Sequence, residues 1–133
     1  MLYVDSSAFL KRYIAEPDSE RSEQYLLADP RWITARHTRI EVRRNLARLL
    51  DGRALDAARN SFEGDWERTF IVALDEATCD LAVDVAEATG ARTLDALHLA
   101  AATRIGTPGL TFVTFDVRQA QAARSLGMVV VGA

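Results

Sequence analysis

The feature that most constrains the fold is an alternation of short apolar runs with longer amphipathic runs along the whole chain. Five short runs have the length and the β-branched or aromatic content of buried strands. They are residues 2–4, 32–34, 69–74, 112–116 and 128–131. Strands that alternate with helices are typical of a parallel sheet covered on both faces. We therefore expect an α/β fold with three layers, α/β/α, around a central and mainly parallel sheet.

Residues that begin or end helices divide the segments between these runs. Asp29-Pro30 ends one helix, because proline disfavours a helical residue before it, and Gly90 and Gly106 are typical residues for the ends of two later helices. The predicted helices cover about 9–14, 19–28, 38–50, 54–66, 76–89, 93–105 and 117–126. No low-complexity segment, linker or internal repeat interrupts this order.

The composition fits an ordinary globular protein. A chain of 133 residues, 49% hydrophobic and 26% charged, is expected to form a single domain over residues 1–133. No apolar run reaches membrane-spanning length, and the amino terminus reads as a strand before Asp5 and not as a secretory leader. We therefore expect a cytoplasmic protein without a membrane partner. The single cysteine, Cys79, is expected to be a buried and inert thiol.

The charge balance argues weakly against a general nucleic-acid binder. Sixteen Lys and Arg residues against 19 Asp and Glu residues give a formal net charge of −3. If cations bound four of the acids, 16 basic residues would face 15 remaining acids, a balance of +1. A metal-loaded acidic site is therefore compatible with binding to phosphate groups.

Four acids stand where a doubly wound sheet would gather them. Asp5 and Asp116 each follow a predicted strand, and Glu41 and Asp95 each lie near the start of a predicted helix. Such a sheet brings strand ends and helix starts to one edge, where four carboxylates repel one another unless cations compensate. Oxygen ligands without a Cys or His cluster suit Mg²⁺ or Mn²⁺ better than zinc. The chemistry that this set favours is metal-assisted phosphodiester hydrolysis.

A structural role explains each acid separately. An Asp at a helix start caps free backbone amides and interacts favourably with the helix dipole. The residues alone therefore leave both readings of the four acids open, the cap and the metal site.

Four segments in order carry a resemblance to a known family. Residues 2–8 (LYVDSSA), 40–44 (IEVRR), 93–100 (TLDALHLA) and 112–116 (FVTFD) resemble the four motifs of PIN-domain nucleases. The resemblance covers essentially the whole chain, and the chain has the length of the VapC toxins of bacterial VapBC toxin–antitoxin modules. A PIN-like fold is what this resemblance implies.

The resemblance also implies an activity and its residues. Asp5, Glu41, Asp95 and Asp116 match the acidic quartet that holds Mg²⁺ or Mn²⁺ for RNA cleavage in that family. Asp5 and Asp95, with Asp116 beside them, are expected to be direct metal ligands. Glu41 is expected to act directly or through water. The implied protein is an endoribonuclease toxin that forms a homodimer and is inhibited by a cognate VapB antitoxin.

Polar residues near the acids complete these expectations. Thr114 and Ser6 match polar positions that support the acids through hydrogen bonds. His98 is expected to be a packed, hydrogen-bonded side chain and His37 an exposed loop residue. Basic residues gather around the helix that carries Glu41, either as a solvated face or as a path for RNA or an acidic partner. They are Arg36, Arg39, Arg43, Arg44 and Arg48, with Lys11 on another helix.

Other functions remain as alternatives. A PIN-like domain that only binds another protein is the main one. A phospho-acceptor receiver domain is disfavoured, because Val4-Asp5-Ser6 lacks the paired acid and residues 130–132 lack the lysine that such a domain needs. The sequence does not identify the RNA that is cleaved.

Overall fold

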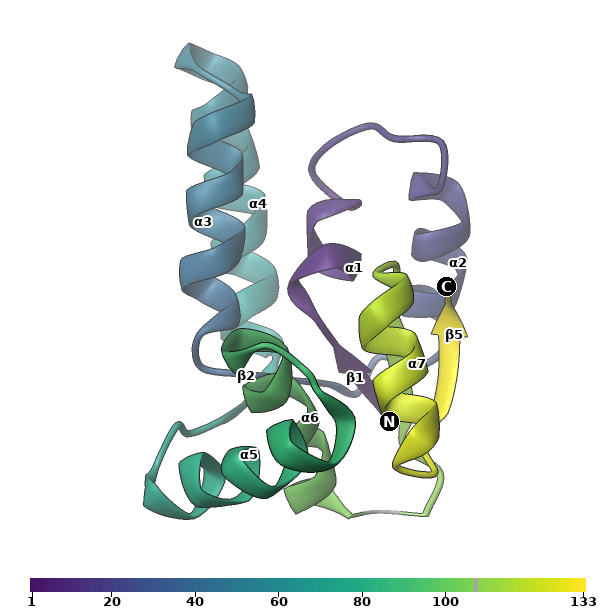
Figure 1. The fold of residues 1–133 in the computed structure, drawn as a ribbon. Coiled ribbons are helices and arrows are strands. Elements are labelled where there is room, and N and C mark those ends of the chain that lie inside the picture. The colour runs from purple at the N-terminus through teal and green to yellow at the C-terminus, as the bar shows by residue number, and fades with distance from the viewer. Residues whose placement is uncertain (107) are drawn as a thin grey trace.

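A computed structural model describes residues 1–106 and 108–133, and within these residues five strands form one parallel sheet (Figure 1). The sheet order is β3-β2-β1-β4-β5, and each neighbouring pair is parallel. The strands are β1 (Leu2–Val4), β2 (Trp32–Ala35), β3 (Phe70–Val72), β4 (Thr111–Thr114) and β5 (Val129–Gly132). The expected α/β class is thus confirmed.

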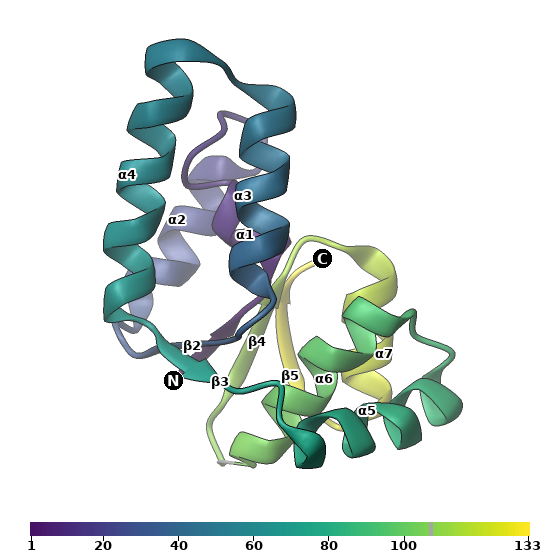
Figure 2. The same cartoon turned by 90° about the vertical axis from the view of Figure 1, so that its left-hand side faces the viewer.

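Helices cover both faces of the sheet, as Figures 1 and 2 show. Helices α1 to α4 pack on one face and α5 to α7 on the other, which gives the three expected layers. The helices are α1 (Ser6–Leu10), α2 (Ser19–Ala28), α3 (Thr38–Leu49), α4 (Gly52–Arg68), α5 (Glu76–Thr89), α6 (Thr93–Ile105) and α7 (Val117–Ser125). In Figure 2, α3 and α4 form a long hairpin that extends away from the sheet.

The pleat of β1 divides the core into two clusters. Tyr3 points to one face, where it packs in the same buried cluster as Leu99 and Phe112. Leu2 and Val4 point to the other face and join the cluster that contains Phe9 and Phe62. Because successive side chains of a strand alternate between faces, a buried run of three residues serves both layers.

The strand order reverses between β1 and β4, and this reversal defines the place for a site. The two strands run side by side with Val4 opposite Val113, and the amide of Asp5 donates to the carbonyl of Val113 at 3.2 Å. In open α/β sheets, ligands bind outside the carboxyl ends of the strands at such a switch point. The chain places Asp5 immediately after β1 and Asp116 two residues after β4.

Some local expectations need correction. The strand expected over 69–74 covers only Phe70–Val72, and the strand expected over 112–116 ends at Thr114, because Asp116 already caps the next helix.

Cys79 was expected to be buried, but it is exposed. Its helix, α5, packs mainly on α6, so the outer flank of α5 stays open to solvent. None of the described helices is long and apolar enough to cross a membrane.

Candidate active site

Asp5 is a buried carboxylate at the carboxyl end of β1. Its side chain is 3% exposed, and its Oδ1 accepts hydrogen bonds from the Ser7 hydroxyl at 2.7 Å and from the Ala8 amide at 3.0 Å. The bond from Ala8 makes Asp5 the N-cap of α1. Burial raises the pKa of Asp5, against the opposing effects of His98, Thr114 and Ser7. A buried carboxylate of this kind is stabilised by a cation.

Asp116 takes the matching position after β4. Its Oδ1 accepts from the Gln119 amide at 3.0 Å, so that it caps α7, while its own amide donates to the Thr114 hydroxyl at 3.1 Å. The residue is exposed. The two strand-end acids therefore act as caps, and their position at the switch point also leaves them suited to a shared site.

Ser7 links the two strand ends. Its hydroxyl donates to Asp5 and accepts from the backbone amide of Phe115 at 2.9 Å, and it lies 3.4 Å from the Thr114 hydroxyl. Ser6 and not Ser7 was predicted from the sequence as a supporting residue. Ser6 helps to lower the pKa of Glu41. A serine that follows a strand-end Asp by two residues is the signal that points to Ser7.

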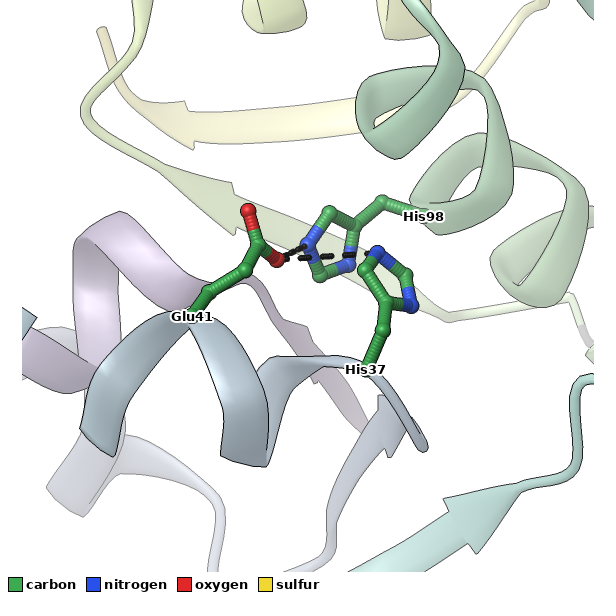
Figure 3. Close-up of side chains that lie close together, drawn as sticks. All are labelled: His37, Glu41 and His98. Atoms are coloured by element: carbon green, nitrogen blue, oxygen red, sulfur yellow. Dashed lines mark hydrogen bonds and ion pairs between the residues drawn. The ribbon is translucent and has the colours of Figure 1, made fainter. Parts of the chain in front are cut away.

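Glu41 is held by a buried histidine (Figure 3). His98 Nε2 lies 2.7 Å from Glu41 Oε1, and His98 Nδ1 lies 2.8 Å from the Tyr3 hydroxyl. Because a carboxylate only accepts, Nε2–H donates to Glu41, and in a neutral ring Nδ1 accepts from Tyr3. Burial, followed by the nearby charge of Asp5, raises the pKa of Tyr3 and keeps it a phenol.

The pKa of Glu41 reflects this contact. Burial by itself raises this pKa, but the hydrogen bond and charge of His98, then His37 and Ser6, outweigh burial and lower it. Glu41 is therefore ionised at neutral pH. The expectation that His98 is packed and hydrogen-bonded is confirmed, since His98 is 1% exposed.

His37 was expected in an exposed loop, and this expectation is wrong. The residue immediately precedes α3 and is only 3% exposed. Its Nε2 lies 3.1 Å from the carbonyl oxygen of Leu94 and 3.5 Å from Glu41 Oε1, and its ring centroid lies 4.1 Å from that of His98. Burial and the charge of His98 lower the pKa of His37 to about 4, so its imidazole is neutral at neutral pH.

Asp95 interacts electrostatically with the other three acids. It lies in the first turn of α6, one turn before His98. Burial raises its pKa most, and the charges of Asp116, Glu41 and Asp5 raise it further, while His98 opposes them. Each of the other three acids therefore lies close enough to Asp95 to interact with it. The four residues of the predicted quartet therefore lie in one region of the structure, but among the described residues the group of three acids or histidines close enough to share an ion is His37, Glu41 and His98.

Two of the four acids line a groove. It has a volume of about 720 Å³, and Asp95 and Asp116 form part of its lining. Arg92 and Arg118 also line it, and both are exposed. These arginines were not predicted from the sequence, although each lies within three residues of an acid of the quartet. A groove lined by both acids and arginines suits a phosphodiester with bound cations.

Comparison with known proteins identifies the family. A family model described as "PIN domain" matches residues 2–125. The chain belongs to the PIN-domain family. Ribonuclease VapC46 of Mycobacterium tuberculosis is 34% identical over 130 residues, which cover 98% of this chain and 95% of that protein.

Solved structures of similar fold agree with this assignment. FitAcB from Neisseria gonorrhoeae has a TM-score of 0.77 at 21% identity and covers 98% of this chain and 96% of its own. A toxin–antitoxin complex from Klebsiella pneumoniae has a TM-score of 0.70 at 15% identity, over 90% of this chain and 89% of its own. At these identities the likeness concerns the fold.

The donor set of this PIN domain fits a hard divalent cation. Asp5, Asp95 and Asp116 offer carboxylate oxygens, which are the ligands that Mg²⁺ and Mn²⁺ prefer. The raised pKa values of Asp5 and Asp95 show that the protein alone stabilises their negative charge poorly. A cation would relieve both the burial and the mutual repulsion of these acids.

The basic residues predicted for RNA or antitoxin contacts are partly paired within the PIN domain. Arg39 and Arg43 both bind Glu63, at 3.0 and 2.5 Å, and Lys11 binds Glu16 at 2.6 Å. Arg44 is exposed. Arg36, Arg39, Ile40 and Arg43 also line a second groove of about 480 Å³.

Proposed function

We propose that this PIN domain is a Mg²⁺- or Mn²⁺-dependent endoribonuclease and the toxin of a VapBC-type toxin–antitoxin module. The observation that carries the proposal is that Asp116, Glu41 and Asp5 all raise the pKa of Asp95, and that Asp5 and Asp116 follow the two strands at the switch point of the sheet. The relative named Ribonuclease VapC46 supports RNA as the substrate. Oxygen ligands support a hard divalent cation.

In this proposal, each side chain has a distinct part. Asp5, Asp95 and Asp116 hold the cation, and Ser7 fixes Asp5 through the 2.7 Å hydrogen bond. Glu41 completes the quartet in an orientation that His98 sets. A divalent cation, when bound, neutralises charge on the phosphodiester and acidifies a nearby water.

The RNA backbone is proposed to follow the groove that Arg92 and Arg118 help to line. Both arginines are exposed and line the groove that contains Asp95 and Asp116, and a guanidinium can contact a phosphate through two hydrogen bonds. They are better candidates than Lys11 and Arg39, whose charges already pair with Glu16 and Glu63.

The partners are also part of the proposal. A VapB-type antitoxin is supported by the likeness to the toxin–antitoxin complex from Klebsiella pneumoniae. Exposed apolar side chains, among them Ile40 at 71% and Leu27 at 70% exposure, provide surfaces for such a partner or for a second copy in a homodimer. The cytoplasm, where the RNA is found, is the proposed compartment.

Incubation of total cellular RNA with the purified protein tests this function. Discrete fragments are expected with Mg²⁺ or Mn²⁺ and none with EDTA, and mapping of the fragment ends identifies the target. Arg92→Ala together with Arg118→Ala is expected to raise KM more than it lowers kcat, because the arginines bind RNA away from the reacting atoms. If no RNA is cleaved with either ion, the proposal fails and a protein-binding module becomes the better account.

A further inference from the structure

His37, Glu41 and His98 form a compact cluster with nitrogen and oxygen donors. One potential ligand atom from each of the three side chains lies within 4.8 Å of the other two. Figure 3 shows both imidazoles directed at the same oxygen of Glu41. The two histidines are 3% and 1% exposed, so the positions of the donors are fixed by packing.

We propose that this cluster is a second metal site, for a borderline transition-metal ion such as Zn²⁺. Two imidazole nitrogens and one carboxylate oxygen form a set that zinc uses in catalytic sites, where a further position stays open. The oxygen-only set of Asp5, Asp95 and Asp116 instead suits Mg²⁺. Two neighbouring donor sets would thus select different ions.

The two nitrogens of His37 have different surroundings. Nε2 is the atom that faces Glu41, 3.5 Å from its Oε1, and it is the potential ligand. Nδ1 is buried and has no hydrogen-bond partner among the described residues, so it does not contact the ion and is the ring position that carries the proton when Nε2 becomes a ligand.

Binding changes the positions of the ring protons. Zn²⁺ requires an unprotonated Nε2 on each ring, so a neutral imidazole moves its proton from Nε2 to Nδ1, and a charged imidazole releases its Nε2 proton to solvent. On His98, Nδ1–H then donates to the Tyr3 oxygen, which already lies 2.8 Å away. His37 gives up the hydrogen bond to Leu94. A ring nitrogen held in this way by a second group is typical of histidine ligands.

The shared residue gives this site a consequence for catalysis. Zn²⁺ on the cluster engages Glu41, a member of the quartet, and adds positive charge next to the Mg²⁺ ligands. It therefore lowers the affinity for Mg²⁺ and slows RNA cleavage. This consequence rests on the proposed function, whereas binding of the ion does not.

Titration with Co²⁺ in the absence of RNA tests the site. Co²⁺ gives intense visible absorption when it is bound in a tetrahedral site with nitrogen ligands, and Zn²⁺ is expected to displace it. The absorption is expected in the wild type and in Asp95→Asn, and it is expected to disappear in His98→Gln and His37→Gln. Tyr3→Phe is expected to weaken binding about 10-fold, because it removes only the partner of a ligand. Far-UV circular dichroism verifies that each variant is folded.

The inference is overturned if His98→Gln and His37→Gln bind Co²⁺ as the wild type does. It is also overturned if Asp95→Asn, and neither histidine variant, loses the absorption, because the ion then binds to the acidic quartet. Cleavage of RNA with Mg²⁺ is measured separately. A protein that cleaves RNA but gives no Co²⁺ absorption refutes only the second site, and the opposite result refutes only the nuclease.

Discussion

Replacement of Tyr3 by phenylalanine isolates the buried hydrogen bond that supports Glu41. Tyr3 is fully buried, and its ring stacks on Phe112 with centroids 4.9 Å apart. Phenylalanine keeps this packing and removes only the hydroxyl, which lies 2.8 Å from His98 Nδ1. The variant therefore loses one hydrogen bond without creating a large cavity.

The size of the effect follows from burial. A neutral hydrogen bond contributes about 1 kcal/mol net, and a buried nitrogen left without a partner costs about 1–3 kcal/mol. We therefore expect Tyr3→Phe to lower the free energy of unfolding by about 2 kcal/mol, which corresponds to roughly 5–8 °C in Tm for a domain of this size. The rate of RNA cleavage is expected to fall as well, because His98 then holds Glu41 less firmly.

Tyr13→Phe is the matched control. It removes a hydroxyl that donates to Asp65 of α4 at 2.7 Å. Tyr13 lies in the turn after α1, and Asp65 keeps its bonds to Arg12 and Arg68. Urea unfolding and cleavage assays compare the two variants. A Tyr3→Phe variant as stable and as active as the wild type, or a Tyr13→Phe variant with an equal loss of cleavage, would refute the role of the Tyr3–His98 hydrogen bond.

Three further predictions concern charge. Mg²⁺ at about 100 times its Kd is expected to stabilise the wild type by about 2.7 kcal/mol and to stabilise Asp95→Asn much less. Differential scanning fluorimetry measures the effect as a shift in Tm, and equal shifts in Tm for both proteins would show that the ion binds elsewhere. Without metal, the pKa values of Asp5 and Asp95 are raised in the folded protein. The two carboxyl groups therefore keep their protons at pH values above 3.8, where the same groups in the unfolded chain have lost them. Stability in EDTA should therefore fall as pH rises through the folded pKa values, and a smaller pH dependence in Asp95→Asn, seen by urea unfolding, would support this. Asp65→Ala removes the buried partner of Arg12 and Arg68 and is expected to cost about 1–3 kcal/mol in urea unfolding, because Arg12 keeps its ion pair with Glu23 and Arg68 is exposed. An unchanged free energy of unfolding would contradict a stabilising role of Asp65.

The sequence allowed the layer order and the approach of two acids to be predicted. Asp5 and Asp116 each follow a strand, and the carboxyl ends of parallel strands meet at one edge whatever the details of packing. The pairing of Glu41 with His98 joins residues 57 positions apart, and it depends on how α3 and α6 sit beside the end of β1. The hydrophobic periodicity of the sequence gives no information on how close Glu41 and His98 lie in space.

The wrong predictions for Cys79 and His37 also arise from contacts between elements that the sequence does not specify. Helical spacing places Cys79 on a helix, but it does not tell which flank of α5 the rest of the fold covers, and Cys79 lies on the open flank. His37 stands among polar residues in the sequence, yet the turn from β2 into α3 directs it inward, toward Leu94 and Glu41. Local sequence predicts elements, whereas the contacts between elements decide burial.

The rate of RNA cleavage by Asp95→Asn tests the central claim most directly. The substrate is the RNA identified from total RNA, the ion is Mg²⁺, and Asp84→Asn on the exposed flank of α5 is the matched control for the same chemical change. The account predicts that Asp95→Asn loses at least about 100-fold in rate, that EDTA abolishes cleavage by the wild type, and that Asp84→Asn cleaves as the wild type does. Cleavage by Asp95→Asn at the wild-type rate would contradict the account.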